Sequence, residues 1–212
     1  YTTPTWRNWS ATLSAREVRA ETDYDLCYTA SFTTSNNCRD DYQNDSQSML
    51  LQHTGEGQSS QVRWSESNSE RAYATDNTVG FSTQGKNRQI SALHSRNLTN
   101  DLSLTVGIDL DEQGYDDGAD QRTRDNNATF VNLRRQSERL TLSAGIRSDD
   151  NDDFGRHTSW RVTALSQTPL DNVVLKIAAG TGFRAPSPYE IGYNSGPWAY
   201  APAADQALSE EQ

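Results

Sequence analysis

The sequence has no run of about 18 apolar residues, and this absence excludes a membrane-spanning helix. Hydrophobic residues make up only 33% of the 212 residues, and the mean hydropathy is −0.88. A soluble domain of this length needs more apolar side chains to fill its core. A barrel with a polar interior needs apolar residues only on the lipid-facing side of each strand. The composition therefore favours a transmembrane β-barrel.

Positive charge and histidine are also scarce. The net charge of −10 and the isoelectric point near 4.7 oppose the binding of nucleic acid. His53, His94 and His157 lie in separate segments, and none has a Ser or Cys in a nucleophile elbow nearby, so we expect no enzyme. The sequence begins at Tyr1 without a Met or a signal peptide, which we interpret as an internal cut or a processed end.

The sequence has only two cysteines, Cys27 and Cys38, in a polar segment rich in Ser, Thr and Asn. No further Cys or nearby His suggests a zinc site. The spacing favours a disulfide over two free thiols, and a disulfide indicates an oxidising compartment.

Alternation of apolar with small or polar residues is the main periodic signal. It is clearest over residues 102–110 and 140–147, and it predicts strands there. Weaker copies bring the expected total to roughly nine strands; they lie at residues 9–15, 49–53, 62–64, 90–94, 129–133, 160–164 and 173–179. Helical spacing fails in each of these windows, so the expected fold class is all-β.

Short and long connections alternate along the chain. Short turns are expected at 54–58, 97–101, 134–138 and 168–172, and long polar loops at 16–46, 66–85, 111–127 and 148–157. This layout is typical of an antiparallel up-and-down outer-membrane barrel with short periplasmic turns and long extracellular loops. The whole chain, 1–212, is then one partial barrel domain. A soluble secreted β-sandwich acting as an adhesin or glycan-binding module is the alternative of another class.

A family resemblance rests on the stretch 176–187, Lys-Ile-Ala-Ala-Gly-Thr-Gly-Phe-Arg-Ala-Pro-Ser. It resembles the strand-to-loop signature of TonB-dependent outer-membrane receptors, whose motif falls here on Gly182, Phe183, Arg184, Ala185 and Pro186. Residues 208–212 resemble that family's following acidic motif, with Ser209 where Pro is common. Residues 114–122 and 147–160 are similar to the cobalamin transporters within the family.

The resemblance implies an energy-coupled transporter in the outer membrane of a Gram-negative bacterium. Such a receptor is a 22-stranded barrel around an N-terminal plug. It takes up a scarce small nutrient and releases it when the TonB–ExbB–ExbD complex pulls on the plug. No plug, coupling box or C-terminal aromatic strand is recognisable, so we expect a barrel fragment. Cobalamin or a related corrinoid is the first expected ligand, and an iron siderophore or haem is the alternative.

The resemblance also suggests site residues. Asp23, Asp25, Asp40, Asp41 and Asp45 match in position the aspartate-rich loops that bind calcium in cobalamin receptors, although a merely solvated acidic loop fits equally well. No other cofactor is expected. Ligand contacts are expected from four aromatic residues that could equally pack the loop upon itself: Tyr189, Tyr193, Trp198 and Tyr200.

Two further groups are charged. The aspartates at positions 149, 150, 152 and 153, flanked by Arg147 and Arg156, predict a salt-bridged turn at the barrel rim. Arg139, Arg147, Arg161 and Lys176 alternate with apolar residues and are expected to face the lumen, where they would pair with carboxylates.

Overall fold

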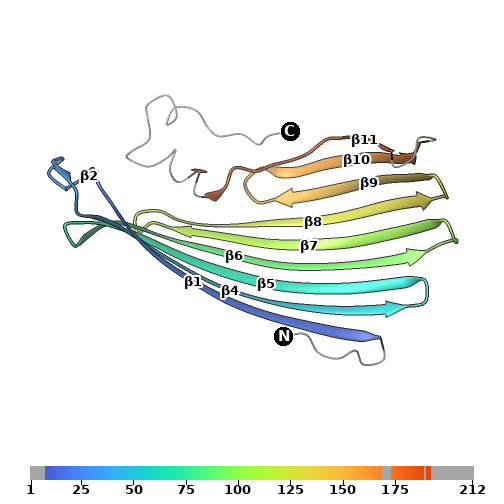
Figure 1. Cartoon of the computed structure of the whole chain (residues 1–212), viewed down its shortest axis with the longest axis horizontal. Coiled ribbons are helices and arrows are strands. Elements are labelled where there is room, and N and C mark those ends of the chain that lie inside the picture. Colours follow the sequence, from blue (N-terminus) through green and yellow to red (C-terminus); the bar gives the residue numbers. More distant parts are fainter. Residues whose placement is uncertain (1–7, 169–172, 189, 192–212) are drawn as a thin grey trace.

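A computed structural model describes residues 8–168, 173–188, 190 and 191. Nine strands form one antiparallel sheet in the order β1-β4-β5-β6-β7-β8-β9-β10-β11 (Figure 1). Apart from the small β2–β3 hairpin, each strand pairs with its neighbours in chain order, so the predicted all-β, up-and-down topology is confirmed. The strands are β1 (Trp9–Tyr24), β2 (Cys27–Tyr28), β3 (Thr34–Ser35), β4 (Cys38–Gly55), β5 (Gln58–Thr75), β6 (Thr78–Asn97), β7 (Leu102–Asp116), β8 (Gln121–Gln136), β9 (Leu140–Asn151), β10 (Gly155–Gln167) and β11 (Val174–Gly180).

The sheet is a single curved layer, as Figure 1 shows, and over the described residues no second sheet packs against it. The β-sandwich alternative is therefore wrong, because a sandwich buries one face of each sheet against the other. β1 and β11 are the two edges, so the barrel is not closed by these strands. Among the described residues, no helix has the length and apolar character needed to cross a membrane.

One face of the sheet, here called the apolar face, carries the aliphatic rows. Residues directly opposite each other on antiparallel strands share a face, and Val62, Ala92 and Ile108 form one such row across β5, β6 and β7. Many large apolar side chains of this face are at least 36% exposed, as lipid contact requires. They include Leu13, Met49, Val62, Ile90, Val106, Ile108, Leu110, Val131, Leu133, Leu142, Ile146, Trp160, Val162 and Ile177.

The four long polar loops predicted from the sequence are wrong for most of their length, because they are strand. β5 has 18 residues and β6 has 20, whereas about 9–11 residues suffice to cross a bilayer. Residues 66–75 and 78–85 continue the β5–β6 ladder almost to its turn. The physical reason is that main-chain pairing does not need apolar side chains, so hydrophobic periodicity shows only the part of each strand that meets lipid.

Tight turns therefore close both ends of the sheet. At the end that carries the β2–β3 hairpin, here called the hairpin end, Asp76 and Asn77 join β5 to β6 with positive φ angles of 52° and 64°. Two positive φ angles in a two-residue connection match the right-handed twist of the flanking strands, and Asp and Asn tolerate them. At the other end Gly57 supplies a positive φ between β4 and β5. The expected turn at 168–172 lies almost wholly outside the described residues.

Candidate functional site

The opposite face of the sheet, here called the polar face, is lined by hydroxyl, amide and charged side chains. A shallow trough of about 520 Å³ runs along β1 and β4–β7 on this side. Small serines leave room between longer amides, so the trough can form hydrogen bonds with a polar ligand or with another protein surface. Its polar-face lining comprises Ser14, Ser46, Ser48, Arg63, Ser65, Ser67, Asn87, Gln89, Asp111 and Gln113.

Arg147 is the centre of the charge network on the polar face. Its guanidinium forms ion pairs with Asp109 and with Asp149, the latter at 3.0 Å between Nη2 and Oδ1. The same guanidinium lies 6.0 Å from the centre of the Phe130 ring. Asp149 also accepts a hydrogen bond from the Asn126 amide at 3.1 Å. One arginine thus links β7, β8 and β9 through two carboxylates.

Asn151 extends this network to the β9–β10 turn. Its amide donates to Asn126 Oδ1 at 3.1 Å, and its own Oδ1 accepts from the main-chain N–H groups of Asp153 and Phe154, each at 3.2 Å. Across the sheet, Arg156 forms an ion pair with Asp150 at 3.0 Å. The predicted salt-bridged turn is therefore confirmed, since Arg147 pairs with Asp149 on the polar face and Arg156 pairs with Asp150 on the apolar face.

Alternation placed the cationic side chains correctly where they lie in strands. Arg147, Arg161 and Lys176 all fall on the polar face by register, while Arg139 lies in the β8–β9 turn. Sequence reasoning missed Arg124 and Asn126, because they fall in a segment expected to be a loop. They could have been found by extending the two-residue alternation of the strand through its polar residues, without requiring apolar ones.

The signature segment after β11 folds back onto the polar face. The Phe183 ring stacks on the His157 ring, with centroids 4.1 Å apart and planes 7° apart. Arg124 of β8 donates a hydrogen bond to the carbonyl oxygen of Pro186. Arg184 forms an ion pair with Glu190 at 3.1 Å. The segment thus does more than turn the strand into a loop, which was the only role that the sequence suggested for it.

A capping box closes the end of this segment. The Ser187 N–H donates to Glu190 Oε2 at 2.6 Å, and the Glu190 N–H donates to Ser187 Oγ at 3.2 Å. The hydrogen bonds from Ser187, assisted by Arg184, hold the pKa of the Glu190 carboxyl below its usual value.

The five aspartates expected to bind calcium do not converge. Asp40 pairs with Arg71 on the polar face, Asp41 and Asp45 lie on the apolar face, and Asp23 pairs with Arg39 at 3.5 Å. Asp25 lies in the bend that follows β1. Because β4 is a strand and not a loop, alternation sends neighbouring aspartates to opposite faces. In the described part of the chain, no group of three or more acidic, His or Cys side chains is arranged to hold a metal ion.

Cys27 and Cys38 form a disulfide in the structure, with their Cα atoms 5.9 Å apart. The bond joins the β2–β3 hairpin to the start of β4, and Cys38 is 2% exposed. The hairpin also docks on the β5–β6 turn, because Ser35 Oγ donates to Asp76 Oδ1 at 2.8 Å and the Asp76 N–H donates to the Asn37 carbonyl at 2.9 Å. The hairpin is therefore held in place from two sides.

Breaking this disulfide is expected to loosen the hairpin without unfolding the barrel. For a loop this short, we expect Cys27→Ser with Cys38→Ser to destabilise the hairpin locally by about 2 kcal/mol. Hydrogen exchange of the complete receptor should show faster exchange between β1 and β4, with strands β7–β9 unchanged. Equal exchange in the variant and the parent would show that the docking contacts alone hold the hairpin.

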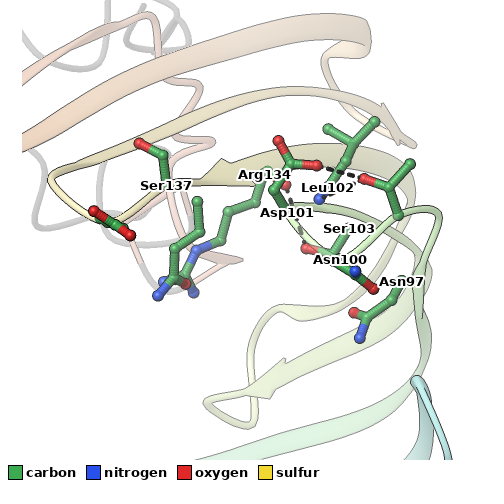
Figure 2. A pocket seen from close by; sticks show the side chains of 10 residues that line it. Asn97, Asn100, Asp101, Leu102, Ser103, Arg134 and Ser137 are labelled. Carbon is green, nitrogen blue, oxygen red and sulfur yellow. Dashed lines mark hydrogen bonds between the residues drawn. The ribbon is translucent and has the colours of Figure 1, made fainter.

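A second hollow, of about 790 Å³, lies at the end of the sheet opposite the hairpin, between the β6–β7 and β8–β9 turns (Figure 2). Asp101 is fixed there by Thr99 Oγ1, which donates to Oδ1 at 2.6 Å, and by Arg135 Nε, which donates to Oδ2 at 2.9 Å. The hydrogen bond from Thr99, followed by that from Arg135, lowers the pKa of the Asp101 carboxyl. These contacts brace the β6–β7 turn against the end of β8, so we assign this hollow a structural role.

The aromatic residues expected to contact ligand, Tyr189, Tyr193, Trp198 and Tyr200, lie outside the described residues. They remain predictions.

Comparison with known proteins settles the family. A family model described as "TonB dependent receptor-like, beta-barrel" matches residues 1–209. The chain belongs to the TonB-dependent receptor β-barrel family. This is a family of receptors and transporters, not of enzymes.

Individual relatives of this TonB-dependent receptor barrel match smaller parts of the chain. The vitamin B12 transporter BtuB of Vibrio vulnificus (strain YJ016) is 35% identical over 92 residues, which are 41% of this chain and 15% of that protein. A Vibrio cholerae BtuB (strain O395) is 30% identical over 99 residues, 45% of this chain and 16% of that protein. The matched region thus spans about a sixth of the relatives' length.

Two solved structures share the fold. The siderophore receptor PirA from Pseudomonas aeruginosa superposes with a TM-score of 0.76 at 15% identity, covering 99% of this chain and 39% of PirA. The FrpB iron transporter from Neisseria meningitidis gives a TM-score of 0.51 at 12% identity, covering 85% of this chain and 42% of FrpB. The expected barrel fold class is therefore confirmed.

Proposed function

We propose that the chain forms part of the wall of an outer-membrane receptor that actively imports cobalamin or a related corrinoid. The observation that carries the ligand class is the 35% identity to a vitamin B12 transporter. The family membership supports coupling to a TonB–ExbB–ExbD complex, and the exposed apolar face supports contact with outer-membrane lipid.

The polar face supports a role as the inner wall. Its trough and the Arg147 network present hydrogen-bonding groups at fixed positions along the strands. A corrinoid carries many amide groups, and donors and acceptors of both kinds on the wall can pair with them. In this proposal the wall guides and contacts the ligand and carries out no chemistry on it.

The test uses the complete gene product, with its native flanks, in Gram-negative cells that lack their own corrinoid receptor. The protein should fractionate with outer membranes, resist extraction by urea, and give the cells saturable binding of radiolabelled cyanocobalamin. Ferric siderophores and haem serve as competing ligands. Binding of one of these in place of cobalamin would reassign the ligand, whereas release as a soluble monomer would contradict the receptor itself.

A further inference from the structure

The signature segment lies across three strands of the polar face, at the hairpin end of the sheet. We call residues 181–188, with Glu190 and Ile191, the strap. It leaves the edge beside β10, where the Thr181 N–H donates to the Trp160 carbonyl at 2.9 Å and the Trp160 N–H donates to Thr181 Oγ1 at 3.2 Å. It then reaches His157 on β10 through Phe183 and Arg124 on β8 through Pro186.

β9 lies between those two strands, so the strap crosses it. The polar side chains along this path are unusually well buried for a single-layer sheet. Asn151 is 3% exposed, Asp149 is 6% exposed and Arg124 is 5% exposed. A charged arginine at this depth is costly unless its donors are satisfied.

Arg124 is satisfied on both sides of the contact. One Nη donates to the Pro186 carbonyl of the strap, and the other donates to Gln113 Oε1 of β7 at 2.5 Å. Asp153 lies 3.8 Å away and supplies a compensating charge. A planar guanidinium can hold two acceptors in fixed directions at once, which an ammonium group cannot do. The strap itself is pre-shaped by its Ser187–Glu190 capping box.

We propose that Arg124 is the positioning residue that holds the strap on the inner wall, and that the docked strap forms part of the surface that the imported ligand meets. The second half of this proposal rests on the proposed function. The strap covers the polar face of β8–β10 at the hairpin end, where three tight connections and the disulfide-held hairpin also lie. A ligand that travels along this face from that end meets the strap.

The experiment compares Arg124→Met, Arg124→Lys and Arg156→Met in the complete receptor in outer-membrane vesicles. Methionine keeps most of the side-chain volume but removes the donors, and lysine keeps the charge but lacks the planar pair of donors that holds two acceptors in fixed directions. Arg156 is a matched control, because it lies on the other face and pairs with Asp150. Heat-dependent gel mobility shows that each variant forms a folded barrel.

Limited trypsin digestion measures how often the strap leaves the sheet, through the rate of cleavage after Arg184, and it needs no ligand. Cleavage tracks the undocked fraction. We expect it to rise roughly tenfold in Arg124→Met, to rise less in Arg124→Lys and to stay at the parent rate in Arg156→Met. Unchanged cleavage in Arg124→Met would overturn the proposal that Arg124 holds the strap on the sheet.

Titration with cyanocobalamin tests the second half of the proposal, that the docked strap forms part of the surface that the ligand meets. If binding needs the docked strap, the Kd should rise by the factor by which the docked fraction falls. A clear fall in the docked fraction, measured from the cleavage rate, with an unchanged Kd would overturn the link to the ligand. If the parent receptor binds no cyanocobalamin, the proposed ligand is wrong. The role of Arg124 in holding the strap is then tested by the cleavage result alone.

Discussion

Replacing Ala92 by lysine is expected to destabilise the folded barrel by about 3 kcal/mol. Ala92 lies on the apolar face, directly opposite Val62 on one side and Ile108 on the other. A lysine there places its ammonium group against lipid near the middle of the apolar row, with no carboxylate among these neighbours. Urea-induced unfolding of the complete receptor in lipid vesicles measures the change.

The neighbouring residue provides the control. Ser91 lies one position earlier on β6 and faces the other side, opposite Arg63 and Asp109. Ser91→Lys therefore adds the same charge to the polar face, close to a carboxylate, and should change the stability by less than about 1 kcal/mol. Equal losses in the two variants would contradict the assignment of the faces, and so would the opposite order.

Arg147→Met is the second change with a large expected effect. It keeps most of the side-chain volume but leaves Asp109 and Asp149 without their shared cation, and the side chains of these two aspartates, taken without their main chain, are only 18% and 9% exposed. Removing one partner from a largely buried ion pair costs about 3 kcal/mol, because the remaining charge is uncompensated. The same unfolding measurement applies.

Two further variants separate this network from ordinary surface charge. Arg156→Met breaks a pair whose side chains are 71% and 57% exposed, so we expect a loss below about 1 kcal/mol. Adding Asp109→Asn and Asp149→Asn to Arg147→Met should recover part of its loss, because the unpaired charges disappear. A triple variant no more stable than Arg147→Met would show that packing, not charge, explains the effect.

Periodicity predicted the fold well where strands meet lipid. The alternation in residues 102–110 and 140–147 corresponds to the central parts of β7 and β9. It failed along residues 66–71, which are Glu, Ser, Asn, Ser, Glu and Arg with no apolar residue among them, although β5 continues to Thr75. Main-chain hydrogen bonds hold that part of the sheet, and side-chain hydrophobicity carries no signal of them.

The candidate site could be predicted only in part, because much of it depends on register. Alternation alone placed Arg147 and Arg161 on the polar face. The contacts of Arg124 with Pro186 and of His157 with Phe183 join residues 62 and 26 positions apart, and no local pattern specifies such pairs. The calcium prediction treated residues 16–46 as a loop, which would gather aspartate side chains that strand β4 instead sends to opposite faces.

The length of β4, β5 and β6 has a thermodynamic consequence for capture. Mobile loops lose conformational freedom when a ligand orders them, and that loss weakens binding. Here the ladder runs to two-residue turns, with one bulge between β5 and β6, so the main chain of this wall is already ordered before any ligand arrives. In the proposed receptor, contact of these three strands with a ligand should therefore carry little of the unfavourable entropy of induced folding.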